Sequence, residues 1–293
     1  MRLNKLIGLV TALVFTGLII LIAYNNLGGE KPTESQINES LNKSISWLVQ
    51  NKTAINKENN AMLWWMMEQA WQETHNGDLK NLLEDYREKH YQNYFSSPWS
   101  YLIYGYKDRI NATQVMAAGM PDYNVFFIYS YSCNADLAEE PIVRQQQELG
   151  FCFTKHPISP ACITHQMMAF RFMQRTGCRK NPAEISDKIA SLASLVKYQL
   201  FFDFRVVDVY LQRVLMLLDT GNQQRINPRW VERVLHNQNE DGGWSGFQPI
   251  LKLGDNRYLG FTTKGISVTA PQSSFHATIQ GVWLMALLKN KPL

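Results

Sequence analysis

The stretch QNEDGGW at residues 238–244 decides the fold that this sequence predicts. A short amphipathic segment, residues 230–236, precedes it, and an apolar segment typical of a buried helix, residues 274–288, follows after a loop. The two glycines of the stretch allow backbone angles that other residues avoid. Its glutamine can bond to the carbonyl groups that a helix end leaves without partners. The order is therefore helix, glycine turn, loop and helix, which indicates paired helices.

The rest of the chain alternates between two kinds of helical segment. Residues 78–90 are amphipathic, with Leu79, Leu82 and Leu83 on one side, whereas residues 61–71 are apolar almost all round. A helix that is hydrophobic on every side must be buried on every side, and an amphipathic helix can cover it and face water. Because strand patterns are rare, we expect an all-α domain in which about five helical hairpins place apolar helices inside amphipathic ones.

The C-terminal part of the chain resembles a known group of proteins. Residues 238–244 are similar to the QW motif of squalene-hopene and related terpene cyclases, and residues 276–288, HATIQGVWLMALL, resemble the inner helix that follows that motif. The resemblance implies an α/α toroid, the fold of these cyclases and of protein prenyltransferases, here as an incomplete barrel. It does not imply terpene chemistry, because the sequence contains neither D-x-D-D nor D-D-x-x-D.

The N-terminal part of the chain has the pattern of a membrane helix. Residues 6–24 carry no charge and are mostly apolar. At about 1.5 Å per residue, a helix of this length covers roughly the 30 Å hydrocarbon core of a bilayer. Arg2 and Lys5 precede it and favour a cytoplasmic N-terminus. A cleaved signal peptide is the alternative. However, the apolar run is longer than the apolar core of a signal peptide, which is usually about 7–15 residues, and Ile-Ala-Tyr at residues 22–24 is a poor cleavage site.

These features divide the chain into three parts. We expect a cytoplasmic stub and single-pass transmembrane signal-anchor at 1–26, a polar tether at 27–40, and one exported domain at 41–293. The anchor would lie in the inner (plasma) membrane and the domain in the periplasm or outside the cell. The whole chain has 29 basic and 25 acidic residues, a net charge of +4, and no basic run. This balance argues against a nucleic-acid partner.

Four cysteines, Cys133, Cys152, Cys162 and Cys178, lie in the expected exported domain. Export would place them in an oxidising compartment, where disulfides persist. Three pairings are possible. We favour Cys133–Cys152 with Cys162–Cys178, because these pairs close two local loops.

Polar residues near the starts of the expected inner helices are the first candidates for a site. His165, Asp208 and His276 each occupy such a position, and Gln212 and Gln280 follow two of them by four residues. Positions i and i+4 share a helix face, so these side chains would point into one cavity. His165 and His276 would act as general acid and base, oriented by Asp208. Hydrogen bonding between helices is the ordinary interpretation of the same residues.

A second group of candidates surrounds tryptophan. Glu68 lies in the segment WWMMEQ at residues 64–69, and it would pair with Asp208 as the two carboxylates of a glycosidase or lyase. Trp65 and Trp99 would offer aromatic faces to a ligand. Core packing of the tryptophans and an ordinary helix-surface role for Glu68 are the alternatives.

A zinc site is a further possibility in this part of the chain. Cys162 and His165, together with Asp208 and His276, would match the type of zinc site found in protein prenyltransferases, provided that Cys162 were a free thiolate. Because a disulfide is expected there instead, we predict no metal and no cofactor.

No motif in the sequence names a reaction. A Gly-rich phosphate loop, H-E-x-x-H and G-x-S-x-G are all missing from the sequence. The sequence therefore favours a membrane-anchored exported protein that binds a glycan, lipid or protein partner in the cell envelope. The alternative is an envelope hydrolase or lyase that acts on a polysaccharide or a lipid-linked substrate through its His, Asp and Glu side chains. Geometry separates the two, because an enzyme needs those side chains to converge in one open pocket.

Overall fold

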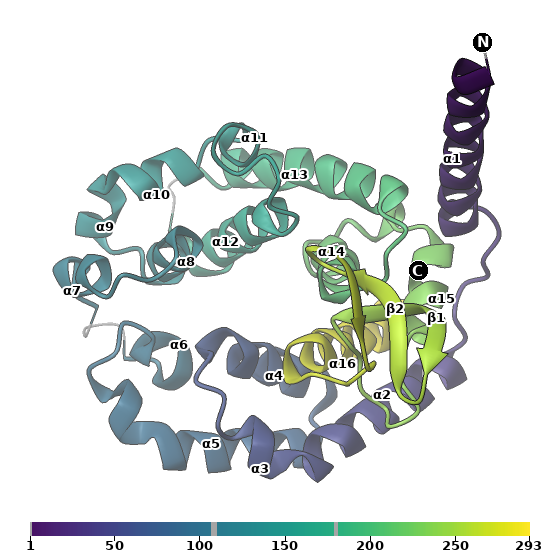
Figure 1. Ribbon diagram of the computed structural model, residues 1–293. Helices are drawn as coiled ribbons and strands as arrows, with labels where there is room; N and C mark the ends of the chain where they lie inside the picture. Colours follow the sequence, from purple (N-terminus) through teal and green to yellow (C-terminus); the bar gives the residue numbers. More distant parts are fainter. Residues whose placement is uncertain (1, 107–109, 179–180) are drawn as a thin grey trace.

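The computed structural model describes residues 2–106, 110–178 and 181–293, and most of them are helical (Figure 1). The helices are α1 (Arg2–Asn26), α2 (Glu34–Gln50), α3 (Lys52–Ile55), α4 (Ala61–Thr74), α5 (Gly77–Phe95), α6 (Ser100–Tyr104), α7 (Ala112–Ala117), α8 (Asp122–Ser132), α9 (Ala135–Glu139), α10 (Pro141–Gln146), α11 (Phe151–Lys155), α12 (Cys162–Thr176), α13 (Pro182–Phe202), α14 (Asp208–Asp219), the 3-10 helix η2 (Gln223–Arg225), α15 (Pro228–His236) and α16 (Phe275–Asn290). The strands are β1 (Phe247–Gly254), β2 (Arg257–Thr262) and β3 (Gly265–Thr269).

The longer helices form an inner and an outer group (Figure 1). Helices α4, α8, α12, α14 and α16 lie toward the centre, with α12 packed against α8 and α14, and α16 packed against α14 and α4. Helices α2, α5, α10, α13 and α15 lie farther out. The division follows the sequence, because nearly every residue of α14 and α16 is buried, whereas α13 buries one stripe that includes Ile185, Ile189, Leu192 and Val196.

A small sheet corrects the expectation of a purely all-α domain. Strands β1, β2 and β3 form an antiparallel sheet in sequence order, in which Leu251 faces Leu259 and Leu259 faces Val268. Asn256 turns the chain between the first two strands with a φ of 52°. The alternation of apolar and polar residues in this segment is typical of a strand, but it spans only a few residues at a time, and the helical pattern on both sides hides it.

The stretch at residues 238–244 forms a joint, as its sequence predicts. Helix α15 ends at His236, and the Gln238 side chain then donates to the carbonyl oxygens of Ser40 (2.9 Å) and Gly242 (2.7 Å). Gly242 has a φ of 92°, and a side chain there would overlap the backbone of Lys43. A residue with a Cβ would therefore be strained and would clash.

Trp244 closes this joint against the last helix. It is buried, and its indole nitrogen donates to the Val234 carbonyl oxygen at 2.9 Å. The ring occupies the space beside Gly281, where any Cβ would overlap it. After the detour through the sheet, the chain returns at Ser274, whose amide donates to the Trp244 carbonyl oxygen at 2.9 Å. One tryptophan thus joins α15 to α16.

Helix α1 is long and apolar enough over Ile7–Asn26 to cross a membrane, and most of this part, up to its last turn, is exposed. Its end is held by the rest of the chain. The Asn25 side chain is buried, donates to the Leu200 carbonyl oxygen at 2.6 Å, and accepts hydrogen bonds from Tyr210 (3.0 Å) and Arg233. The polar stretch 27–40, expected to be a tether, contains the start of α2 at Glu34, so only a short link separates the two helices.

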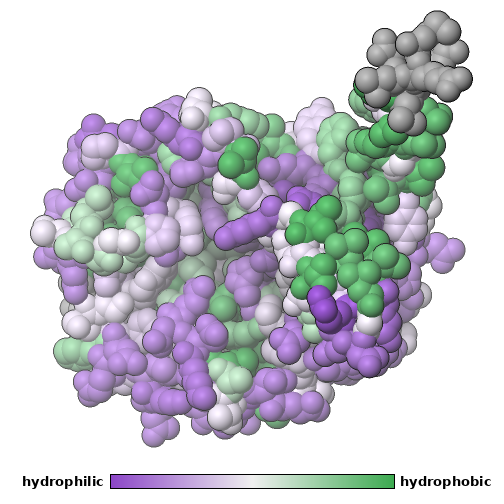
Figure 2. Space-filling model, viewed as in Figure 1, coloured by the Kyte–Doolittle hydropathy of each residue, from purple (hydrophilic) through white to green (hydrophobic). Residues whose placement is uncertain are grey.

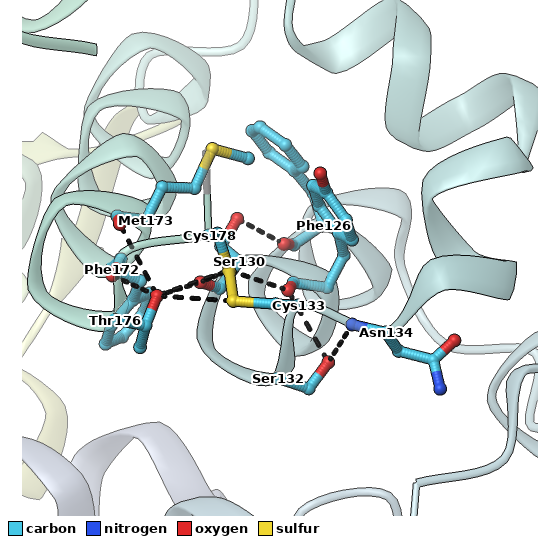
Figure 3. The surroundings of a disulfide bond; sticks show 10 residues. Phe126, Ser130, Ser132, Cys133, Asn134, Phe172, Met173, Thr176 and Cys178 are labelled. Atoms are coloured by element: carbon cyan, nitrogen blue, oxygen red, sulfur yellow. Dashed lines mark hydrogen bonds between the residues drawn. A yellow bond between two sulfur atoms is a disulfide. The ribbon is translucent and has the colours of Figure 1, made fainter. Parts of the chain in front are cut away.

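The two disulfides correct the expected pairing. The bonds are Cys133–Cys178 and Cys152–Cys162, and Figure 3 shows the first beside Thr176. Cys133 directly follows α8, and Cys178 lies two residues after α12. Because α8 and α12 pack side by side, the ends of the two helices meet although 45 residues separate the cysteines. A preference for local loops misses this, because it takes no account of which helices are neighbours.

Candidate functional site

Five inner helices begin around one cavity of about 540 Å³. We call it the central cavity, and Figure 2 shows a hollow in the middle of the visible face. Its lining includes five of the residues singled out from the sequence: His165, Asp208, Gln212, His276 and Trp99. The structure thus brings together side chains from α12, α14, α16 and the segment before α6. Gln280 follows His276 by one helical turn, is fully buried outside the cavity lining, and contacts the His276 ring through its amide nitrogen.

Asp208 and His276 form a pair at the wall of the central cavity. The His276 Nδ1 lies 3.3 Å from Asp208 Oδ2, while Asp208 Oδ1 accepts hydrogen bonds from the Val209 amide (2.8 Å) and the Thr263 hydroxyl. Burial raises the pKa of the Asp208 carboxyl, but the hydrogen bonds from His276 and Thr263 outweigh burial and hold this pKa below its ordinary value. Asp208 is therefore ionised at neutral pH, and its Oδ2 can accept a hydrogen bond from the Nδ1–H of His276.

The neighbours of His276 select one arrangement of its ring protons. With Nδ1–H directed at Asp208, Nε2 carries the lone pair, and the Gln280 amide nitrogen lies 3.3 Å from it. Gln280 is buried, and in the part of the chain that the structure describes its Oε1 has no hydrogen-bond partner. The His276 side chain itself is 46% exposed. In this tautomer the Gln280 amide donates to the Nε2 lone pair, so a water molecule or ligand in the cavity must displace this hydrogen bond before Nε2 can take up a proton.

His165 is a second imidazole on the same cavity, with different surroundings. Its ring stacks on Tyr123 at 4.4 Å between centroids and meets the edge of Phe127 at 5.8 Å. Burial, and to a smaller extent the nearby His276, lower the pKa of His165 to about 4 against the opposing effect of Asp208. No described residue forms a hydrogen bond with its ring nitrogens. His165 is thus neutral at neutral pH, with one nitrogen that donates and one that accepts.

The remaining lining of the central cavity is aromatic and amide-rich. Trp99 and Tyr123 contribute rings, and Asn59 and Asn60 contribute amides at the rim. Gln212 accepts a hydrogen bond from Thr164 at 2.8 Å, which leaves its NH₂ group without a partner among the described residues. Glu58 and Asp208 are both acidic, and none of the described lining residues is Lys or Arg. An anionic ligand is therefore disfavoured relative to a neutral or cationic one.

Glu68 and Trp65 lie elsewhere, on a second cavity of about 640 Å³. There Glu68 accepts a hydrogen bond from Arg87 at 2.9 Å, and Arg87 also donates to the Ile103 carbonyl oxygen at 3.1 Å. Glu68 and Asp208 thus line different cavities. The difference follows from their places in the helices, because Asp208 is the first residue of α14 whereas Glu68 lies two turns into α4.

Two side chains of the site, Asn60 and Thr263, are missing from the sequence-based candidates, and a third, Tyr123, falls in the aromatic stretch 123–131, which the sequence offers as possible cavity lining or core. Tyr123 is the second residue of α8, so the rule that selects polar residues early in an inner helix would also have found it. Asn60 is the N-cap of α4, and its side chain accepts from the Met62 amide at 3.1 Å, which is a recognisable helix start. Thr263 lies in the turn between β2 and β3, and nothing in the sequence places that turn beside Asp208.

The zinc arrangement considered from the sequence does not form. Cys162 is joined to Cys152, so it offers no thiolate to a metal beside His165. Across residues 2–106, 110–178 and 181–293, no group of three or more His, Cys, Asp or Glu residues could hold a metal ion.

Comparison with protein-family models, with curated proteins and with solved structures gives no significant match. The function must therefore be argued from the central cavity and from the residues that line it.

Proposed function

We propose that the protein is a membrane-anchored envelope hydrolase whose α/α-toroid domain acts on an uncharged glycan-like substrate in the central cavity. One observation carries the proposal: the Asp208–His276 pair and the neutral His165 line the same cavity. The sequence by itself favours a binding protein because no motif names a reaction. An enzyme requires its reactive side chains to converge in one pocket, so the convergence of these three residues favours an envelope hydrolase over a binding protein.

The two histidines suit different tasks in hydrolysis. His276 would take a proton from water through Nε2 once the water has displaced the Gln280 amide from that nitrogen, while the Asp208 carboxylate accepts its Nδ1–H and stabilises the imidazolium that forms. His165, neutral because of its lowered pKa, would donate a hydrogen bond to an oxygen that gains negative charge. The water oxygen would then bond to an acyl carbon, the bond from that carbon to a sugar oxygen would break, and the proton held by His276 would pass to the leaving sugar oxygen. A base that activates water and a neutral donor for the oxyanion are the groups that this hydrolysis of an acyl linkage needs. The proposed substrate is therefore an acylated glycan.

The lining of the central cavity supports this class of substrate. Aromatic rings such as Trp99 and Tyr123 pack against the C–H faces of sugar rings, and amides such as Asn60 and Gln212 donate to and accept from hydroxyl groups. The excess of carboxylates over basic groups on the lining favours uncharged sugars over uronates or phosphates.

The anchor rests on α1 and on the disulfides. Helix α1 is apolar and exposed, and its end is fixed to α13 and α15, so removal by a signal peptidase would break contacts of Asn25 with the domain. The two disulfides suit an oxidising compartment beyond the membrane. Intact mass spectrometry of the protein from a membrane fraction tests this part, and a chain that lacks α1 would contradict it.

The hydrolysis is tested with the full chain in detergent micelles. Acetylated neutral oligosaccharides are incubated with it in water enriched in ¹⁸O, and mass spectrometry measures ¹⁸O in the released acid. We expect His276→Ala to lower the rate about 10²–10⁴-fold and His165→Ala about 10²–10³-fold. His236→Ala, at an exposed position on α15, is the matched control and should keep the wild-type rate. Binding of glycans without turnover by the wild-type chain would refute the enzyme and favour the binding protein.

A further inference from the structure

The small sheet presents an apolar face that the rest of the chain leaves partly uncovered. Leu251, Ile266 and Val268 are 55%, 69% and 42% exposed. Leu251 pairs with Leu259, Leu259 with Val268, and Phe261 with Ile266. Residues that pair across strands share a face, as do alternate residues of one strand, so these five side chains lie on one side. We call them the apolar sheet face.

The apolar sheet face lies close to the end of α1. Phe261 packs its ring against Phe204 at 5.6 Å between centroids. The Phe204 carbonyl oxygen accepts a hydrogen bond from Arg233 at 2.7 Å, and Arg233 also bonds to Asn25. One short chain of contacts therefore connects the sheet to the last turn of the apolar helix. Figure 2 shows hydrophobic surface over the sheet and over α1 on the same visible side of the molecule.

Exposed aromatic side chains extend this surface at the end of α13. Phe201 and Phe202 are exposed, and they directly follow Leu200, whose carbonyl oxygen accepts from Asn25. A residue that neighbours the end of a membrane-spanning helix lies near the level of the headgroups, where aromatic rings are favoured. Apolar side chains on the sheet and at the end of α13 thus both lie near the point at which α1 would leave the bilayer.

Basic residues surround the sheet. Arg257 on β2, which shares the face of Leu259, and Lys264 in the turn between β2 and β3 are exposed. Lys252 on β1 is also exposed, but it pairs with Tyr258 and so lies on the opposite side of the sheet. One acidic residue of this segment, Asp255 in the turn between β1 and β2, is exposed. Apolar side chains flanked by basic ones are the combination that binds the interface of an anionic bilayer, because the apolar groups enter the boundary layer and the cations meet the headgroups.

We propose that the apolar sheet face rests in the interfacial layer of an anionic bilayer beside α1. The proposal depends on the anchoring part of the proposed function and not on the hydrolysis. It explains why several large apolar side chains are exposed together on one side of the sheet. It also has a consequence for the central cavity, because Thr263 in the β2–β3 turn donates to Asp208. Docking would therefore hold one part of the cavity wall at the bilayer surface, where a lipid-linked glycan is presented.

The test places an environment-sensitive nitrobenzoxadiazole (NBD) label on each face of the same strand. The full chain is reconstituted in vesicles of phosphatidylcholine and phosphatidylglycerol with the label on Ile266→Cys or on Ser267→Cys. Ser267 pairs with Gly260 on the opposite side of the sheet, so it is the matched control. The four native cysteines are bonded to one another, so only the introduced thiol reacts.

We expect the label at position 266 to shift its emission to the blue and to be quenched by lipids that carry a quencher near the headgroup, since interfacial elements enter about 5–10 Å. The label at 267 should respond much less. Quenching that is equal at both positions, or lacking at both, would overturn the proposal. If the label at 266 is shielded in micelles and the chain migrates there as a dimer, a second copy covers the face and the proposal also fails.

Carbonate extraction of the same vesicles tests the anchor separately. Chain that stays with the vesicles while position 266 is not quenched refutes docking and leaves the anchor in place. Chain that is extracted refutes the anchor and with it this proposal. Hydrolysis of acetylated oligosaccharides in micelles requires no bilayer, so its failure would leave the docking result unaffected.

Discussion

The lowered pKa of His165 predicts a specific loss of stability in acid. The folded chain holds the pKa of this imidazole at about 4, against an ordinary value of 6.5. As the pH falls below 6.5 the unfolded chain takes up a proton at this position and the folded chain does not, so unfolding becomes easier. The loss begins near pH 6.5 and is complete near pH 4, whereas above pH 6.5 the group has no effect on stability.

The size of this loss follows from the shift in pKa. Each pKa unit corresponds to about 1.4 kcal/mol, so the full loss is about 3 kcal/mol, and most of it has been lost at pH 4.5. For a domain of this size that is a fall in Tm of roughly 5–10 °C. Hydrogen bonds hold the pKa of Asp208 below 3.8, so this carboxyl titrates below the window and does not imitate the effect.

His165→Phe is the variant that isolates the histidine. A phenyl ring can keep the packing against Tyr123 and Phe127 but cannot take up a proton. Urea unfolding of both chains in micelles, followed by tryptophan fluorescence at pH 7 and 4.5, gives the two free energies. We expect the wild type to lose about 2–3 kcal/mol more than the variant. An equal loss in both chains, within about 0.5 kcal/mol, would refute the reasoning.

Three further predictions concern the unfolding free energy of the domain. Gly281→Ala should lower the unfolding free energy by about 1–3 kcal/mol, because its methyl group would overlap the buried indole of Trp244. The control Gly77→Ala, in open space at the start of α5, should change the unfolding free energy by under about 1 kcal/mol. Equal urea midpoints for the two variants would contradict the predicted overlap. If disulfides stabilise by restricting the unfolded chain, Cys133→Ser should lower the unfolding free energy by about 4 kcal/mol and Cys162→Ser by about 2.7 kcal/mol, because the two bonds span 45 and 10 residues. A larger loss for Cys162→Ser in the same urea assay would exclude this explanation. Asp219→Asn should cost about 2–4 kcal/mol, because this buried carboxylate accepts from two arginines; a change below about 0.5 kcal/mol in thermal unfolding would count against that role.

Part of the site was predictable because few places suit a polar residue on an apolar helix. His165, Asp208 and His276 lie within the first turn of helices whose other side chains are mostly buried, and a polar group there must meet a joint or a cavity. The i, i+4 rule then placed Gln280 against His276. Glu68 was harder to place, because a tryptophan neighbour does not indicate how far along the helix a cavity lies.

Other features depend on contacts that no local pattern encodes. The pairing of Cys133 with Cys178 requires α8 and α12 to be neighbours. The sheet escaped prediction because its strands are short and leave much of their apolar side exposed, whereas the period-two pattern is expected of strands that bury one face. Thr263 reaches Asp208 only because that sheet folds over the start of α14.

Trp244 and Gly281 have a consequence for distant relatives of this chain. The indole occupies the volume that a side chain at position 281 would need, so the two positions cannot change independently. A relative with alanine or serine at the second position would need a smaller ring, or none, at the first. Because the whole sheet lies between the two residues in sequence, their correlated change would mark a shared fold even where the loops and the sheet have diverged.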